Sequence, residues 1–166
     1  MNIATIAFVG LGGNLGDATG RLRQALVALD GLPDTRVMRA SRLYRTPAWG
    51  VTAQPDFVNA VAMIDTLLAP QALLQYLLQT ERQAGRDRNA DGGDRWGPRT
   101  LDLDLLLFGD GVIDLPGLTV PHPHLHERAF ALVPLLEIAP DVQIPGYGAA
   151  AGLLAGLATV DMQALG

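Results

Sequence analysis

The sequence predicts an α+β protein with a ferredoxin-like sandwich. In this fold a central, mostly antiparallel sheet is flanked by helices, and here a C-terminal hairpin and helices are added. The periodicity of hydrophobic residues gives the order strand, helix, strand, strand, helix, strand over the first two-thirds of the chain. A length of 166 residues with 49% hydrophobic residues indicates one domain, residues 1–166, with a substantial core.

The first predicted unit is a buried strand over residues 3–11, a glycine-rich turn and a helix capped by Asp17. The helix ends at Gly31 and Pro33. Its buried stripe consists of Leu22, Ala25, Leu26 and Leu29. A dinucleotide-binding loop fits poorly, because Leu15 stands where the last glycine of that fingerprint belongs and no βαβ unit follows.

A second strand is predicted over residues 35–44 and a third over residues 57–65, with a long loop between them. Loops of this length inside a compact domain are usually functional. In the third strand Asn59 is the polar member of an otherwise apolar face. A buried amide needs hydrogen-bond partners, which either a flat heterocycle or neighbouring backbone can supply.

The second helix is predicted to begin at Pro70 and to end at Gly85, with a buried stripe of leucines. The polar, glycine-rich segment 86–95 then predicts a loop that closes over a site and excludes water. A solvated surface loop with incidental arginines is the alternative.

The strand that begins at Leu101 carries the clearest chemical signal. Side chains alternate along a strand, so Asp102 and Asp104 share one face, about 7 Å apart, while leucines occupy the other. Such a pair suits Mg²⁺, which takes one or two carboxylates and completes its shell with water and substrate phosphates. Five arginines fall between Arg82 and Arg99 and can bind phosphate oxygens. Together they predict metal-assisted phosphoryl transfer, although the aspartates could instead face open solvent.

Composition narrows the functional classes. The net charge is -5, and all 12 basic residues are arginine, which excludes a phosphate-loop lysine and a Schiff-base lysine. An acidic chain argues against nonspecific nucleic-acid binding. Cysteine is absent, which excludes disulfides and thiolate metal sites. There is no basic leader and no apolar run that could span a bilayer, so we expect a cytoplasmic monomer without membrane contact.

Residues 112–120 predict a short excursion or hairpin that leads into three histidines at alternate positions, His122, His124 and His126. Zinc requires three or four convergent ligands, and the neighbouring prolines hold this bend extended, so a zinc site is disfavoured. A helix bent by Pro134 follows, and the tail after Tyr147 predicts a short packing helix.

The run Arg-Trp-Gly-Pro-Arg-Thr-Leu-Asp-Leu-Asp at 95–104 closely resembles the signature of the 6-hydroxymethyl-7,8-dihydropterin pyrophosphokinase (HPPK) family. The resemblance extends from the first strand to Pro140. It includes a Gly-x-Asn turn, a Tyr-Arg-Thr-Pro loop, and Pro-His-Pro before a helix that contains Arg and Phe.

This resemblance implies transfer of pyrophosphate from ATP to a pterin alcohol, with two Mg²⁺ ions and release of AMP. It assigns metal binding to Asp102 and Asp104, and catalysis to these two residues with Arg86 and Arg99. It assigns ATP to Arg88, Trp96, His122 and Arg128. The pterin would be bound by Thr46, Pro47, Trp49, Phe57, Asn59 and Phe130.

In the family the segment 86–95 is a catalytic lid, and Asp91-Gly92-Gly93 look like an insertion relative to the shorter version. Two functions from other classes compete with this interpretation. One is a nucleotidyltransferase that uses the same metal pair to transfer AMP. The other is a ferredoxin-like ligand-binding domain without catalysis.

Overall fold

The computed structural model describes residues 3–47, 56–84, 100–159 and 161–165. The first part of the chain forms β1 (Thr5–Gly13), α1 (Ala18–Asp30), β2 (Thr35–Ala40), β3 (Leu43–Thr46), β4 (Phe57–Thr66), α2 (Pro70–Gln83) and β5 (Asp102–Phe108). The rest forms β6 (Ile113–Leu115), β7 (Leu118–Val120), a 3-10 helix η1 (Leu125–Glu127), α3 (Ala129–Ile138), β8 (Gln143–Ile144), β9 (Gly148–Ala149), α4 (Ala150–Leu154) and β10 (Gln163–Leu165).

The central sheet has six strands in the order β10-β3-β4-β1-β5, and β2 also pairs with β4. All pairings among its described strands are antiparallel. If β2 and β3 are counted as one interrupted strand, the four strand positions follow the ferredoxin-like order. The predicted fold class is therefore confirmed.

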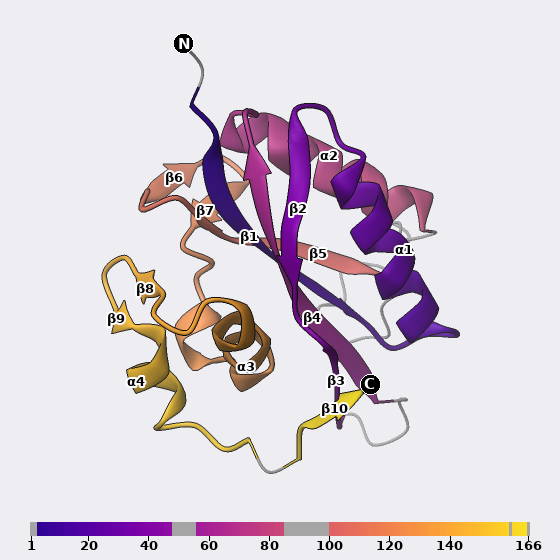
Figure 1. The fold of residues 1–166 in the computed structure, drawn as a ribbon, viewed down its shortest axis with the longest axis vertical. Helices are drawn as coiled ribbons and strands as arrows, with labels where there is room; N and C mark the ends of the chain where they lie inside the picture. The colour runs from indigo at the N-terminus through magenta and orange to yellow at the C-terminus, as the bar shows by residue number, and fades with distance from the viewer. Residues whose placement is uncertain (1–2, 48–55, 85–99, 160, 166) are drawn as a thin grey trace.

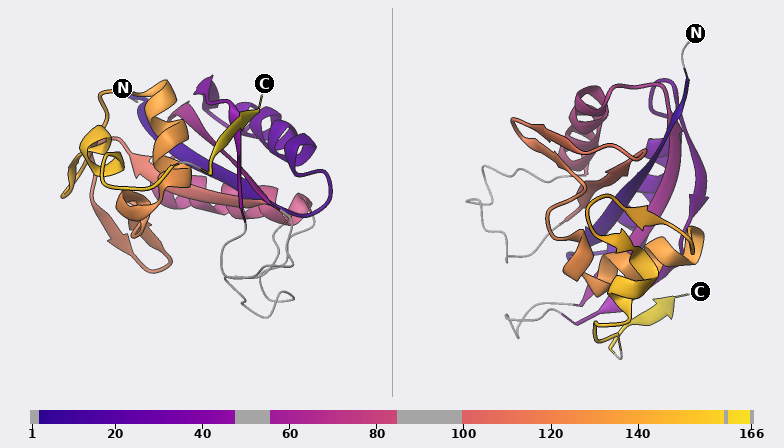
Figure 2. Two further views of the ribbon diagram at one scale, coloured as in Figure 1. Left: turned by 90° about the horizontal axis from the view of Figure 1, so that it is seen from below. Right: turned by 90° about the vertical axis from the view of Figure 1, so that its left-hand side faces the viewer.

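Alternation along the strands produces two hydrophobic cores, one on each face of the sheet. Helices α1 and α2 cover one face, where Val9 of β1 and Ile64 of β4 are fully buried. Helices α3 and α4 lie on the other side, where Phe8 and Val61 pack against Leu132. Figure 2 gives two further views, in which α3 and α4 (orange to yellow) lie apart from α1 and α2 (purple to magenta).

The ends of both long helices follow from local sequence. The Asp17 carboxylate accepts a hydrogen bond from the Gly20 backbone N–H at 3.0 Å, as predicted for a cap. This bond is the main cause that lowers the pKa of Asp17. Pro70 occupies the first turn of α2, where its missing N–H costs nothing, and Leu73 and Leu77 are fully buried.

The predicted second strand over residues 35–44 is wrong in one respect, because it is divided into β2 and β3. Ser41 lies between them. Its hydroxyl accepts a hydrogen bond from Val61 N at 2.9 Å and donates one to Arg42 O at 2.7 Å. The side chain thus takes a place that a backbone group would hold in a regular ladder. The first strand also continues through Gly13, beyond its predicted end at Leu11.

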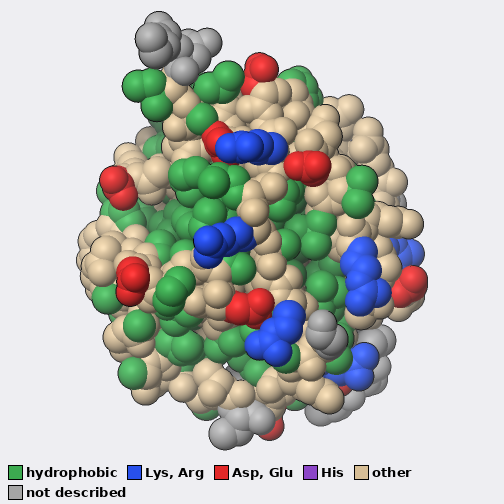
Figure 3. Space-filling view, viewed as in Figure 1, with side chains coloured by type: hydrophobic (Ala, Val, Ile, Leu, Met, Phe, Trp, Pro, Cys, Tyr) green, Lys and Arg blue, Asp and Glu red, His purple; other side chains and the backbone are tan. Residues whose placement is uncertain are grey.

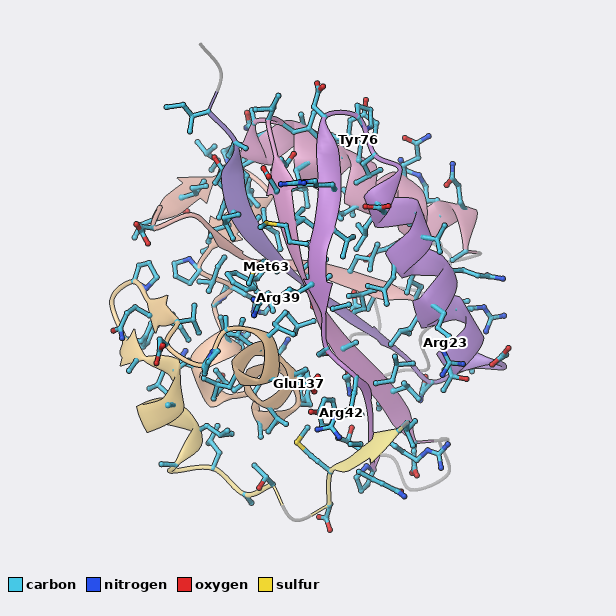
Figure 4. All side chains as sticks on the ribbon, in the orientation of Figure 1. Arg23, Arg39, Arg42, Met63, Tyr76 and Glu137 are labelled. Carbon is cyan, nitrogen blue, oxygen red and sulfur yellow. The ribbon has the colours of Figure 1, made fainter. Side chains whose placement is uncertain are left out.

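The C-terminal third covers the sheet face opposite α1 and α2. The predicted hairpin is present as β6 and β7, and α3 contains Pro134. Where α3 meets β3, Glu137 accepts hydrogen bonds from the Tyr44 hydroxyl and from the Arg42 backbone N–H. Figure 4 shows Arg42 and Glu137 side by side, and their ion pair spans 3.4 Å.

The face shown in Figure 3 carries exposed apolar side chains with arginines and carboxylates scattered among them. Among the described residues, no helix is both long and apolar enough to cross a bilayer.

Candidate active site

A cleft of about 660 Å³ lies between the sheet and the segment that leads into α3. The described residues that the sequence assigned to metal, nucleotide and heterocycle all line it: Thr46, Pro47, Phe57, Asn59, Asp102, Asp104, His122, Arg128 and Phe130. They come from β3, β4, β5 and the chain that enters α3, so tertiary folding brings together four separate stretches of sequence.

The floor of the cleft is a row of residues across three neighbouring strands. Gly12 of β1 lies opposite Asn59 of β4 on one side and Asp102 of β5 on the other. Two residues along β1, Gly10 lies opposite Asp104. Glycine at both positions keeps this floor low, because a side chain there would project into the cleft. An amide and a carboxylate thus face the same space across a gap of one strand.

Asp102 and Asp104 occupy the face predicted for them, while Leu103 and Leu105 are buried on the other. The β5 strand is also held from α2, since the buried Glu81 carboxylate accepts a hydrogen bond from Leu103 N at 2.7 Å. No group of three or more His, Cys, Asp or Glu that could hold a metal ion occurs in the described part of the chain. Two carboxylates fit an ion such as Mg²⁺, which draws its remaining ligands from water and phosphates, and do not form a complete protein cage.

The amide side of the cleft is preorganised. Asn59 is 9% exposed, and its Nδ2 donates to Thr46 Oγ1 at 3.3 Å. Thr46 lies opposite Phe57 in the β3–β4 pairing, so the hydroxyl, the amide and an aromatic ring gather at one end of the cleft. Phe130, at the first turn of α3, is 40% exposed, which leaves ring surface available to a flat ligand.

His122 is neutral at physiological pH in this structure. Burial is the main cause that lowers its pKa to about 4, and the positive charge of Arg128 adds to the effect. Its Nδ1 accepts the His124 backbone N–H at 3.1 Å, so the ring proton of the neutral form is on Nε2. The His122 backbone N–H in turn donates to Leu106 O at 3.0 Å, which fixes the histidine beside β5.

The three histidines have different surroundings. His124 Nδ1 lies 2.5 Å from Glu127 Oε1, and this hydrogen bond is the main cause that lowers the pKa of Glu127. His126 stacks on Tyr147, with ring centroids 4.2 Å apart, and does not line the cleft. Arg128 lines the cleft with its guanidinium 5.5 Å from the centre of the Phe130 ring, which is within cation–π range.

Five predicted site residues lie outside the described residues: Trp49, Arg86, Arg88, Trp96 and Arg99. The predicted loop over 86–95 with its insertion at 91–93 lies outside them as well.

Sequence reasoning missed three parts of the cleft. It treated Gly12 as part of a turn, although continued alternation from Phe8 through Gly10 to Gly12 would have placed both glycines on the aspartate face. It did not place Glu127 at the cleft. It also overlooked a C-terminal stretch on the cleft wall, made of Leu157, Ala158, Thr159, Asp161 and Met162.

Comparison with known proteins gives strong sequence matches. A family model described as 7,8-dihydro-6-hydroxymethylpterin-pyrophosphokinase (HPPK) matches residues 8–140. A protein of Pseudomonas aeruginosa called 2-amino-4-hydroxy-6-hydroxymethyldihydropteridine pyrophosphokinase is 49% identical over 138 residues, which is 83% of each chain. Proteins of the same name from Methylorubrum extorquens and Haemophilus influenzae are 45% and 44% identical. The Methylorubrum match covers 86% of this chain and 87% of the relative, and the Haemophilus match covers 84% of each.

Among solved structures, a triple mutant of Plasmodium falciparum HPPK-DHPS with STZ-DHP superposes with a TM-score of 0.72 at 14% identity. The match covers 93% of this chain and 43% of that one, so the chain spans less than half the length of that protein. This likeness supports the fold, whereas the sequence matches identify the family. The chain belongs to the 7,8-dihydro-6-hydroxymethylpterin-pyrophosphokinase (HPPK) family.

Proposed function

We propose that this protein transfers pyrophosphate from ATP to the hydroxymethyl group of 6-hydroxymethyl-7,8-dihydropterin and releases AMP, as a step of folate biosynthesis. Family membership and the names of its relatives support this reaction. The structural observation that links this reaction to the cleft is the position of the amide and the carboxylates on one floor. Asn59 and Asp102 flank Gly12 on adjacent strands, so a heterocycle at the amide would hold its hydroxymethyl arm near the carboxylates.

The amide end recognises the pterin. Asn59 offers both a donor and an acceptor, and a pterin ring presents both kinds of group along its edge. Phe57 and Phe130 supply aromatic surface on which the ring can stack, and Thr46 holds the Asn59 amide in place. Trp49 and Pro47 belong to the same proposed subsite.

The phosphate end consists of charged groups and one neutral imidazole. Arg128 carries a permanent positive charge, and the Nε2–H of neutral His122 is a hydrogen-bond donor for a phosphate oxygen. Arg88 and Trp96 are assigned to ATP with them, and Arg86 and Arg99 to the transferring group. These donors stabilise the charge that develops as AMP departs.

Asp102 and Asp104 would hold two Mg²⁺ ions, which when bound neutralise triphosphate charge and favour attack on the β-phosphorus. In the step itself, the hydroxymethyl oxygen forms a bond to the β-phosphorus of ATP. The bond from that phosphorus to the oxygen it shares with the α-phosphorus breaks, and its electron pair leaves on AMP. The hydroxyl proton is lost, and the two carboxylates carry oxygens on this part of the floor that can accept it.

The test is AMP release from ATP labelled in the γ-phosphate, with and without hydroxymethyl-dihydropterin, and with Mg²⁺ present or chelated. AMP should appear only when pterin and Mg²⁺ are both present, and the label should move to the pterin. A nucleotidyltransferase would leave the label in free pyrophosphate. A binding domain without catalysis would consume no ATP, and release of ADP would contradict transfer of the pyrophosphoryl group.

A further inference from the structure

The C-terminal tail, defined as residues 157–159 and 161–165, lies beyond the family match at 8–140 yet forms part of the cleft. It follows α4 and ends in β10, next to β3 (Figure 1). Five of its residues line the cleft, as described above, so the tail is a wall of the site.

The pairing of β10 determines which end of the cleft this wall borders. Gln163 lies opposite Arg45 and Leu165 lies opposite Leu43, in antiparallel register. Asp161 lies in the turn before β10 and Met162 joins that turn to the strand, and both line the same cleft as Thr46 and Pro47. A hydrogen bond from Met162 N to Thr159 O at 3.1 Å shapes the turn just before the strand. The tail therefore borders the amide end of the cleft, where Asn59 donates a hydrogen bond to Thr46.

The negative charge of Asp161 also favours a role at the pterin end of the cleft rather than at the phosphate end. A carboxylate beside the phosphates would repel them, whereas beside a pterin it meets an exocyclic amino group and a ring N–H, which are donors that a carboxylate accepts well. Asp161 is exposed at the rim and Met162 is half-buried, so one offers an accessible acceptor and the other an adaptable apolar contact.

We propose that the C-terminal tail is the outer wall of the pterin subsite, in which Asp161 accepts hydrogen bonds from the N–H groups of the ring edge and Met162 packs against the ring. Asp161 and Met162 are positioning residues that set pterin affinity and take no part in phosphoryl transfer. The inference rests on the proposed function, because it names the ligand of that same cleft.

The test compares Asp161→Asn with a matched control, Asp141→Asn, which removes an exposed carboxylate away from the cleft. For Asp161→Asn the KM for hydroxymethyl-dihydropterin should rise about five- to twentyfold, the range for losing a partly exposed charge-assisted hydrogen bond. The KM for ATP and kcat at saturating pterin should stay unchanged. Asp141→Asn should match the wild type in all three.

A pterin analogue without the exocyclic amino group distinguishes direct recognition by Asp161 from a structural role. A structural role would reduce binding of the pterin and of the analogue by the same factor. The advantage of the wild type over Asp161→Asn should shrink with this analogue, because one of the two donors that the carboxylate recognises is gone. Met162→Ala should weaken binding of the pterin and of the analogue by the same factor, since it removes a contact with the ring.

The outcomes separate the two proposals. If the wild type releases no AMP with pterin and Mg²⁺, the proposed function fails. If the wild type is active but Asp161→Asn behaves as Asp141→Asn does, or loses the same factor with pterin and analogue, the role given to Asp161 is overturned. Circular-dichroism melting of each variant confirms that it is folded, which an exposed Asp-to-Asn change should not alter.

Discussion

The two glycines on the cleft floor make a matched pair for testing whether Asn59 must keep its position. A Cβ added at Gly12 would lie 2.8 Å from Asn59 Oδ1, which is closer than real Cβ contacts allow. A Cβ added at Gly10 would meet nothing nearer than the Leu106 side chain at 3.4 Å, which is an ordinary contact. Gly12→Ala should therefore displace the amide, and Gly10→Ala should not.

The expected loss follows from what Asn59 would give up. Turning the amide away from the new methyl group breaks its bond to Thr46 and misdirects its donor and acceptor toward the pterin. One or two hydrogen bonds of this kind are worth about 1–3 kcal/mol, so pterin affinity should fall by about 5- to 150-fold. Thermal stability should change little, because alanine lowers the entropy of the unfolded chain and offsets part of the local strain.

Isothermal titration of each variant with hydroxymethyl-dihydropterin and a nonhydrolysable ATP analogue measures this loss directly. Gly12→Ala should lose much more pterin affinity than Gly10→Ala at similar melting temperatures. Equal losses in the two variants would mean that any methyl group on the floor obstructs the ligand. Unchanged affinity in Gly12→Ala would refute the placement of the pterin at Asn59.

Three further predictions concern activity, pH and the core. Asp104→Ala should abolish pterin-dependent AMP release, while the melting temperature of the metal-free protein stays close to that of the wild type. A much lower melting temperature would mean that Asp104 is needed for folding, and would contradict this prediction. The pKa of His122 is lowered to about 4 in the folded state, so its contribution to stability is complete above the unfolded pKa of about 6.5 and is lost as the pH falls from there toward 4. The stability advantage of the wild type over His122→Asn, from urea unfolding, should therefore shrink from about pH 7 to about pH 5, by about 1 kcal/mol after allowance for the partly solvated ring. Leu132→Ala removes a fully buried side chain and should cost about 2–5 kcal/mol in the free energy of unfolding, whereas the exposed Val27→Ala should cost far less.

Much of the site could be predicted from sequence because its signals are local. Asp102 and Asp104 share a face wherever this segment forms a strand, and Asn59 is conspicuous on its apolar face for the same reason. The cap at Asp17 and the helix start at Pro70 depend on neighbouring residues in the same way.

The parts that sequence reasoning missed depend on long-range pairing. β10 has only three residues and becomes a strand because it lies beside β3, so nothing in its own periodicity places Asp161 at a cleft. The break at Ser41 depends on Val61, which is 20 residues away, and hydrophobic patterning carries no trace of that bond.

The position of β1 in the sheet has a consequence for synthesis of the chain. As an inner strand it needs β4 on one side and β5 on the other, and Ala7 pairs with Phe108. While the chain emerges from the ribosome, β1 can pair with β4 before β5 exists, and until then one edge of β1 stays open. An open edge of this kind can add a strand from another chain. The strand that bears the two aspartates thus also covers the open edge of β1, and until it is made that edge is a place where another chain can pair.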